Sequence, residues 1–395
     1  MGKKLRTLLT RLTAMLFGLL LALLIIEVGL RLAYHSLSPR LQTALRDVRV
    51  SPFSDDRLAP PPLWRDDTRY LTIVTPGAQN SLQAGSPDVL FHVTSYSWWN
   101  GRVGFRSPPP TDGTLDAVAL GDSFTFCFTE LEDCWVTRVA AQTGIKIANL
   151  GQPVTGSMGH ARIYQDFVSS ITALKQPKLV LWEFYGNDFN DDYGLARLEG
   201  TNKIPPPADP SGQVPDTGFK LWLRQHSILY TLIGTMRRGV DPGVEMFVDP
   251  YRVQANGIDI AFGQSYIRDA FNMAEPRNQE GEQLSYAAIL ATKATVEANG
   301  GKFIILLMPT KEEVYRPVTE PQMGKAAIDA IAEPRLRLIT FCKAQTIICL
   351  DLFSALQAHS SSQIYFPTDP HLTSEGNRVA AEAIVQFLRD QGIAM

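Results

Sequence analysis

The fold is decided by one stretch of the chain, Val118-Ala119-Leu120-Gly121-Asp122-Ser123-Phe124-Thr125-Phe126. Residues 116–120 are typical of a short buried strand, and Gly121 permits a tight bend before the serine. A strand that ends at Gly-Asp-Ser places the hydroxyl at the carboxyl end of a sheet, where open α/β folds bind ligands. Ser123 is therefore a candidate nucleophile. The alternative is an ordinary strand-to-helix turn in which Asp122 and Ser123 cap the next helix.

The chain after this stretch alternates between apolar strands and helical segments. We expect strands at 116–120, 145–150, 179–184, 303–308 and 346–350. We expect helices at about 133–143, 158–174, 282–299, 326–343 (broken near Pro334) and 373–389. Strands that alternate with helices favour a parallel sheet with helices on both faces.

The N-terminal residues have a different character. Four basic residues between Lys3 and Arg11 precede the run Leu12 to Leu30, in which only Thr13 and Glu27 have polar side chains. Nineteen helical residues at about 1.5 Å each come close to the roughly 30 Å of a bilayer core. We therefore predict a membrane anchor over 1–37, with Glu27 and Arg31 able to pair near the outer interface.

The basic flank predicts a cytoplasmic N-terminus, which places the catalytic domain outside the cytoplasm, at the cell surface or in the periplasm. A cleaved signal peptide is the alternative interpretation. The formal net charge of −3, from 37 basic and 40 acidic residues, gives no basic field for nucleic acid.

The four cysteines form two pairs in the sequence. Cys127 and Cys134 are seven residues apart, and so are Cys342 and Cys349. Neither pair has the spacing of a metal site, and an oxidising compartment would allow two local disulfides. Four independent buried thiols are the alternative.

Two segments flank or interrupt the α/β pattern. Residues 38–113 are expected to form a small β-rich lead-in, with strands at 70–74 and 90–94, before a domain over 114–395. An insertion at about 190–280 contains an amphipathic, helical stretch from Phe219 to Arg237. It is interpreted either as a lid over the site or as a structural excursion packed on the sheet edge.

A serine hydroxyl needs a base, and the base needs an acceptor that orients it. His371 follows Asp369 by two residues in an extended segment, so both side chains face the same way. The alternative for His371 is a surface turn before a helix capped by Thr373. Asn187 follows the strand at 179–184, and the loop 151–156 can offer backbone N–H groups to an oxyanion.

These motifs together resemble those of an SGNH (GDSL-type) hydrolase. Gly121-Asp122-Ser123 matches the first block of the family, Gly186-Asn187-Asp188 the third, and Asp369 with His371 the last. The resemblance covers about 116–392 apart from the insertion. Upstream, the anchor and Gly104-Phe105-Arg106 resemble the lead-in of membrane-anchored members. The resemblance to SGNH hydrolases implies a three-layer, flavodoxin-like α/β fold with a parallel sheet.

The resemblance also implies roles for individual residues. Ser123 would be the nucleophile, His371 the base and Asp369 its orienting partner, with no metal or cofactor. The oxyanion donors would be Ser123, Asn187 and Gly156, and Asp122 and Asp188 would support the site.

Three positions depart from the family pattern. In most of the family the aspartate precedes the histidine by three residues, but Asp369 precedes His371 by two. The spacing of two is the one found in relatives that O-acetylate cell-surface glycans. Tyr185 replaces a common glycine, and the expected glycine of the second block is either Val154 or, after a shift, Gly156.

The expected function is an extracytoplasmic serine esterase that acts on an acylated small molecule, glycan or lipid. The alternatives are an O-acyltransferase that modifies cell-surface polysaccharide and a non-catalytic binding protein on the same fold.

Overall fold

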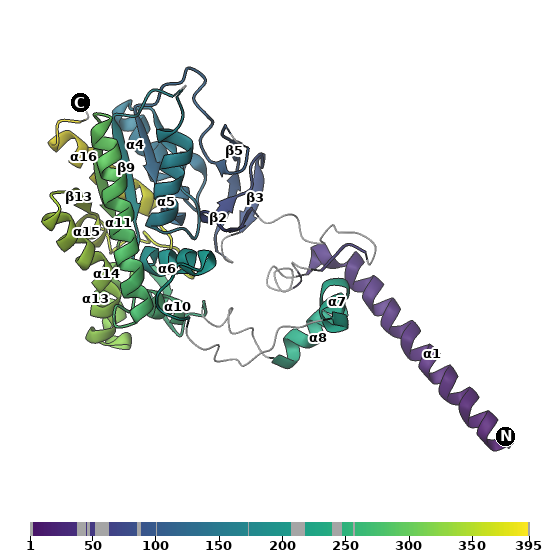
Figure 1. Ribbon diagram of the computed structural model, residues 1–395. Coiled ribbons are helices and arrows are strands. Elements are labelled where there is room, and N and C mark those ends of the chain that lie inside the picture. Colours follow the sequence, from purple (N-terminus) through teal and green to yellow (C-terminus); the bar gives the residue numbers. More distant parts are fainter. Residues whose placement is uncertain are drawn as a thin grey trace. The chain divides into compact units, whose positions relative to one another are not determined.

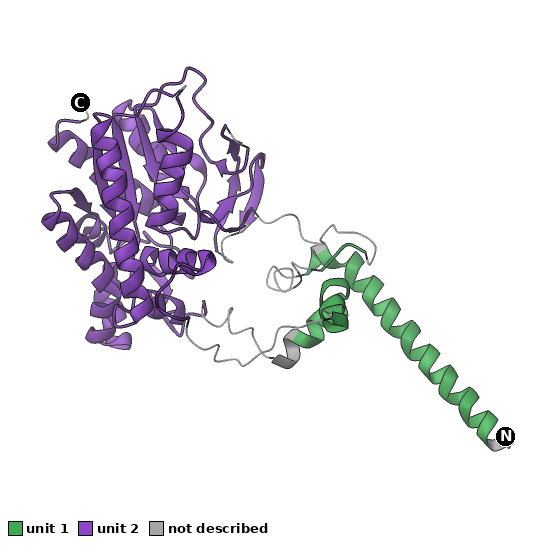
Figure 2. Ribbon diagram, in the orientation of Figure 1, with its two compact units in different colours: residues 1–62, 208–245 green, residues 63–207, 246–395 purple. Residues whose placement is uncertain are grey.

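The computed structural model describes residues 3–37, 45, 48–51, 63–84, 88–99, 101–172, 174–206, 218–238, 247–255 and 257–393 (Figure 1). The chain forms two compact units (Figure 2). We call residues 1–62 with 208–245 the anchor unit, and residues 63–207 with 246–395 the sheet unit.

The sheet unit is built on five strands in the order β13-β12-β9-β7-β8, and every neighbouring pair is parallel. The strands are β7 (Ala117–Leu120), β8 (Ile147–Asn149), β9 (Leu179–Phe184), β12 (Lys302–Leu307) and β13 (Ile348–Asp351). Each predicted strand is present with bounds within two residues of expectation, and β9 is buried along its whole length. The predicted parallel α/β sheet is confirmed.

Helices cover both faces of this sheet. They are α4 (Trp135–Thr143) and α16 (Ser374–Asp390) on one face, and α5 (Ser157–Tyr164) and α11 (Pro276–Ala298) on the other (Figure 1). Side chains of β7 alternate between the two cores, Ala117 and Ala119 toward α4 and α16, Val118 and Leu120 toward α5 and α11. The result is a three-layer α/β fold.

Shorter elements complete the unit. They are α3 (Ser123–Phe126), α6 (Asp188–Glu199), β10 (Tyr251–Ala255), β11 (Ile258–Phe262), α10 (Ser265–Ala270), α12 (Lys311–Val314), α13 (Arg316–Met323), α14 (Lys325–Ala344), α15 (Phe353–Ala358), and 3-10 and π turns at Leu131–Asp133 and Gln165–Ser169. The predicted break near Pro334 is wrong, because α14 runs through it. Pro334 is buried there, and the next residue, Arg335, ties α14 to Glu313 and Asp351.

The lead-in is β-rich, as predicted. It contains three antiparallel pairs: β1 (Trp64–Asp67) with β2 (Leu71–Val74), β3 (Ser81–Ala84) with β4 (Leu90–Val93), and β5 (Tyr96–Ser97) with β6 (Gly104–Phe105). Residues 38–44, 46–47, 52–62, 85–87 and 100 of the predicted lead-in lie outside the described residues. The first two pairs share an apolar cluster with Phe126 and Phe128, which lie just after Ser123.

The anchor unit contains α1 (Lys3–Leu32), a 3-10 turn (Tyr34–Ser36), α7 (Gly218–His226) and α8 (Ile228–Arg238). Residues 5–32 of α1 are long and apolar enough to cross a membrane. The predicted insertion is therefore divided: α6, β10, β11 and α10 belong to the sheet unit, and α7 and α8 to the anchor unit. The helix predicted over Phe219–Arg237 is two helices that meet at Ser227.

Candidate active site

The serine turn caps a short helix and places Ser123 at the end of a strand of the sheet. Asp122 caps α3, since its carboxylate accepts a hydrogen bond of 2.8 Å from the backbone N–H of Phe124. Ser123 is the first residue of α3 and lies at the carboxyl end of β7. Gly121 is required here because a Cβ atom would overlap with the side chains of Thr125 and Glu183. The helix cap and the partly buried Ser123 hydroxyl thus belong to one turn.

Ser123, His371 and Asp369 lie in a chain of contacts. The Nε2 atom of His371 is 2.7 Å from Oγ of Ser123, and its Nδ1 atom is 2.5 Å from Oδ1 of Asp369. The same carboxylate oxygen accepts a 2.9 Å hydrogen bond from the backbone N–H of His371. Thr373 also caps α16 by accepting a hydrogen bond from the Gly376 N–H, as the turn interpretation of this loop predicted.

Aromatic side chains hold the imidazole of His371. Its ring centroid lies 4.8 Å from that of Phe124 and 4.2 Å from that of Phe128. Phe128 is in turn stacked on Trp64 and Phe91 of the lead-in, at 5.5 Å and 5.3 Å. The lead-in therefore supports one wall of the site, which the sequence pattern around Ser123 did not indicate.

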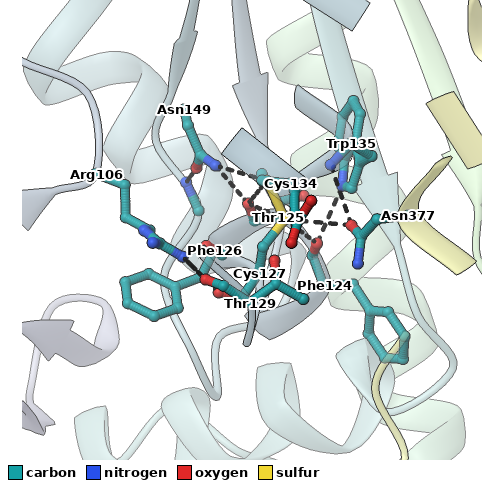
Figure 3. The surroundings of a disulfide bond; sticks show 12 residues. Arg106, Phe124, Thr125, Phe126, Cys127, Thr129, Cys134, Trp135, Asn149 and Asn377 are labelled. Carbon is teal, nitrogen blue, oxygen red and sulfur yellow. Dashed lines mark hydrogen bonds between the residues drawn. A yellow bond between two sulfur atoms is a disulfide. The ribbon is translucent and has the colours of Figure 1, made fainter. Parts of the chain in front are cut away.

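The carbonyl groups that follow Ser123 are bound by side chains from other elements (Figure 3). A four-residue helix leaves its last carbonyls without partners inside the helix. The indole of Trp135 donates to the Phe124 carbonyl at 3.0 Å, and the amide of Asn149 donates to that of Thr125 at 2.6 Å. These contacts fix the backbone directly after Ser123.

Arg106 binds the next part of this turn. Its Nη1 atom donates to the carbonyls of Phe126, Cys127 and Thr129 at 3.2, 2.6 and 2.9 Å (Figure 3). Its Nη2 atom donates to the carbonyl of His92 at 3.1 Å. The side chain is 1% exposed, and this burial lowers the pKa of Arg106 to about 10. Its only signal in the sequence was the Gly104-Phe105-Arg106 resemblance.

A second contact joins the lead-in to the loop that carries His371. The carboxylate of Asp88 accepts hydrogen bonds from the backbone N–H of Thr368, at 2.9 Å, and from its hydroxyl. Thr368 directly precedes Asp369. The lead-in thus holds both the turn with Ser123 and the loop with His371.

Asn187 is buried at the end of β9, and its amide is partly engaged. Its Nδ2 atom donates a 2.9 Å hydrogen bond to Asp191. A carboxamide nitrogen carries two hydrogens, and the Asn187 side chain also interacts with the hydroxyl of Tyr266. The adjacent Asp188 is fully buried and accepts a 3.1 Å hydrogen bond from Ser157.

Several carboxyl groups are buried behind the site: Asp122, Glu183, Asp188, Asp191 and Asp192. Burial raises the pKa of each, to about 8 for Asp191 and about 7 for Asp192, and the charge of Asp122 further raises the pKa of Glu183. Burial also lowers the pKa of His160 to about 3, so the imidazole 3.8 Å from Asp188 is neutral. Sequence analysis missed Glu183, Asp191 and Asp192 as neighbours of the site.

The second-block loop combines a strained and a crowded residue. Val154 has φ 55°, a left-handed conformation that favours glycine, and its side chain is exposed. Gly156 has an extended backbone at φ −98°, where a Cβ atom would overlap with Asp188 and Asp192. Of the two positions considered for the family glycine, Val154 therefore has the glycine-like backbone.

Both cysteine pairs lie at disulfide distance. The sulfur atoms of Cys127 and Cys134 are 2.11 Å apart, and those of Cys342 and Cys349 are 2.12 Å apart. The first pair joins the end of the serine turn to the start of α4 (Figure 3). Among the described residues, no group of three or more His, Cys, Asp or Glu side chains could hold a metal ion.

These features define an α/β domain with a serine turn at the carboxyl end of a central strand and an Asp-x-His loop after the last strand. Residues 266–394 match the family model described as "SGNH hydrolase-like domain, acetyltransferase AlgX". This segment contains Asp369 and His371, and Ser123 and Asn187 precede it. The predicted resemblance to SGNH hydrolases and the SGNH-like fold are confirmed.

Solved structures and curated proteins complete the comparison. Similar chains are a member of the lipolytic protein G-D-S-L family from Veillonella parvula (12% identity, 69% of this chain and 97% of that one, TM-score 0.36) and a GDSL-like lipase from Bacteroides thetaiotaomicron (13%, 72% and 91%, 0.33). An acetylxylan esterase from Geobacillus stearothermophilus is similar at 13% identity over 70% of this chain and 93% of that one, with a TM-score of 0.36. No curated protein matches the chain.

Proposed function

We propose that the protein is a serine-dependent acyl-ester hydrolase that acts through Ser123, His371 and Asp369. The Oγ atom of Ser123 attacks the ester carbonyl while Nε2 of His371 takes its proton and then passes it to the departing alcohol. An acyl-serine remains. His371 next deprotonates a water molecule that attacks this ester, and the proton returns to Ser123 as the carboxylate leaves.

Asp369 orients the imidazole and stabilises its protonated form. The backbone N–H of Ser123, the amide hydrogen of Asn187 that does not bind Asp191, and a backbone N–H of the second-block loop, at Gly156 or Val154, would stabilise the oxyanion. Asp122 and Asp188 have supporting roles: Asp122 caps α3, and Asp188 binds Ser157 at the start of α5.

The observation that carries this proposal is the contact chain from Asp369 through His371 to Ser123, at 2.5 and 2.7 Å. It joins residues 248 positions apart in the sequence, with the base within hydrogen-bond reach of the nucleophile.

The full chain, purified in detergent, tests it with p-nitrophenyl esters from acetyl to long-chain acyl and with a fluorophosphonate label. We expect Ser123→Ala to lose both hydrolysis and labelling, and His371→Ala to lose hydrolysis, while their thermal unfolding stays that of the wild type. His359→Ala is the matched control, because the His359 ring is exposed at the end of α15, where its Nδ1 atom bonds the Ala355 carbonyl. Full hydrolysis by folded Ser123→Ala would refute the assignment.

One observation favours a second function, O-acyl transfer to a cell-surface polysaccharide. The description of the family model that matches residues 266–394 names an acetyltransferase, AlgX. In this reaction a sugar hydroxyl replaces water as the attacking group. An acetyl ester supplied with and without an oligosaccharide acceptor separates the two. Acetylated oligosaccharide formed faster than free acetate would favour transfer, and free acetate alone would favour hydrolysis.

We further propose that α1 anchors the chain in a membrane with the sheet unit outside the cytoplasm. The apolar stretch 5–32 and the basic residues before it support this orientation. Substrates would then be acylated glycans, lipids or small molecules at the cell surface or in the periplasm. Protease added to sealed cells or spheroplasts tests the orientation, because it should digest the sheet unit and spare α1.

A further inference from the structure

A carboxylate near the end of α1 caps a helix that lies about two hundred residues later in the chain. Glu27 accepts hydrogen bonds from the backbone N–H groups of Ile228 and Leu229, both at 3.0 Å, and from the hydroxyl of Ser227 at 2.9 Å. These groups open α8, where unpaired N–H groups favour a negative charge. Glu27 therefore serves as the N-terminal cap of α8.

Arg31 completes the same joint. It donates to Glu27 at 2.9 Å and to the carbonyl of His226, the last residue of α7, at 2.6 Å. It also binds the carbonyls of Arg49 and Val50. The predicted ion pair between Glu27 and Arg31 is confirmed, and each side chain is only 17% exposed. Both residues also bind groups of the α7–α8 hairpin. It fixes both ends of the α7–α8 turn to α1.

An apolar cluster surrounds this joint within the anchor unit. Its buried members are Tyr34, Leu45, Val48, Ile228 and Leu232, with Leu30 and Leu37 packed against them. The hairpin α7–α8 therefore packs on the end of α1 through apolar and polar contacts together.

The α7–α8 hairpin exposes both apolar and basic side chains. Phe219 is 71% exposed and stacks on Trp222, with ring centroids 5.7 Å apart. Leu221 and Ile233 are exposed as well, and the basic side chains of Lys220 and Arg224 are also at the surface. Exposed aromatic and basic side chains on one short helix are typical of segments that lie in the membrane interface.

The position of the joint along α1 indicates where the hairpin lies. Glu27 is five residues before the end of α1 at Leu32, or about 8 Å along the helix axis. If the apolar stretch of α1 spans the roughly 30 Å core, this level is the boundary between acyl chains and headgroups. At this level of a bilayer, apolar side chains can contact acyl chains and basic side chains can contact lipid phosphates.

We propose that α7–α8 is an interfacial element, clamped on α1 by Glu27 and Arg31, whose Phe219–Trp222 face lies in the lipid bilayer at the end of α1. This inference rests on the anchoring part of the proposed function and not on the hydrolase chemistry. It assigns the middle of the predicted insertion to the membrane interface.

A fluorescent probe at position 219 tests the lipid contact. Full-length Phe219→Cys is labelled with an environment-sensitive dye and reconstituted into phosphatidylcholine–phosphatidylglycerol nanodiscs that contain brominated lipid. The native cysteines are paired at disulfide distance, which leaves the introduced thiol for labelling. Lys220→Cys is the matched control, because its side chain is rotated by about 100° on the helix. We expect strong quenching at 219 and weaker quenching at 220.

The same emission from both positions, unquenched and typical of water, would overturn the interfacial placement. Quenching that needs an added acyl-ester substrate would instead indicate a substrate-binding lid and would also overturn it. A dye at 219 shielded only in particles that hold two chains would indicate a second copy as the partner.

A second experiment tests the clamp. Glu27→Gln should speed amide hydrogen exchange of residues 218–238 in nanodiscs by roughly two- to thirty-fold, the range expected for loss of a helix cap. Thr13→Ala is the control, because the Thr13 hydroxyl bonds only the Leu9 carbonyl of its own helix. Hydrolysis of a soluble acetyl ester should not change in Glu27→Gln. Unchanged exchange would overturn the clamp.

The two proposals fail in different ways. A mature chain that lacks α1, detected by mass spectrometry of the membrane fraction, would overturn the interfacial element and leave the hydrolase assignment intact. Activity that survives in Ser123→Ala would overturn the hydrolase assignment and leave the quenching and exchange results unaffected.

Discussion

The guanidinium of Arg106 donates a 2.6 Å hydrogen bond to the carbonyl of Cys127, so a residue of the lead-in holds the backbone that leaves the serine turn. We expect Arg106→Lys to lower the free energy of unfolding by about 2–4 kcal/mol, because one ammonium cannot reach all the carbonyls that the guanidinium binds and leaves some of them buried without partners. Urea unfolding of the sheet unit, followed by tryptophan fluorescence, measures this change.

Arg252→Lys is the matched control for this substitution. The side chains of Arg252 and its partner Asp259 are 53% and 33% exposed, and exposed ion pairs contribute about 0–1 kcal/mol. Equal effects of the two substitutions would show that the buried contacts of Arg106 do not stabilise the turn.

Asn187 tests the oxyanion assignment. One N–H of its amide is used by Asp191, and we assign the other to the developing oxyanion. We expect Asn187→Ala to lower kcat by about 10²–10³ with a small effect on KM, the cost of one lost oxyanion donor. Asn202→Ala, which removes an amide bound to the Ile204 carbonyl, should leave both constants unchanged. A rise in KM alone would assign Asn187 to substrate binding instead.

The buried carboxyl of Asp191 predicts a pH dependence of stability. Its pKa is raised from 3.8 to about 8 by burial, so between these values the folded state holds a proton that the unfolded chain releases. The resulting stabilisation is complete below about pH 4 and is lost as the pH rises toward 8, by up to about 1.4 kcal/mol per pH unit. Asp191→Asn should flatten the fall in stability between pH 5 and pH 8.

Denaturant unfolding across this pH range gives the slope, and Asp66→Asn, at an exposed carboxyl, serves as control. The same slope in wild type and Asp191→Asn would mean that Asp191 is ionised in the folded protein.

The parts of the site that follow from local sequence could be predicted. A strand, its turn and the first residues after it are close together in the chain, so Ser123, Asn187 and the Asp369–His371 pair followed from the apolar runs before them and from residue types. Their meeting at one sheet edge followed from the parallel topology. The paired cysteines, seven residues apart, were equally local.

Long-range contacts could not be predicted in this way. Asp88 and Arg106 bind loops whose partners are set by the packing of the lead-in, and no spacing relates them to Thr368 or Cys127. The same holds for Asp191, since a carboxylate early in a helix is normally solvated and only the tertiary fold buries it. For Glu27, the sequence predicted the local pair with Arg31, four residues later, but gave no sign of the contact with α8.

Val154 offers a test of the second-block loop. A non-glycine residue in the left-handed region costs about 1–3 kcal/mol of stability. Replacement by glycine removes this strain but destabilises the folded state by roughly 0.5–1 kcal/mol, because glycine loses more backbone entropy on folding. Because the Val154 side chain is 45% exposed, little apolar burial is lost on its removal. We therefore expect Val154→Gly to stabilise the protein by about 1 kcal/mol in denaturant unfolding. Val248→Gly, at an exposed valine without a positive φ, should destabilise it. Destabilisation by both would show that the Val154 backbone is not strained.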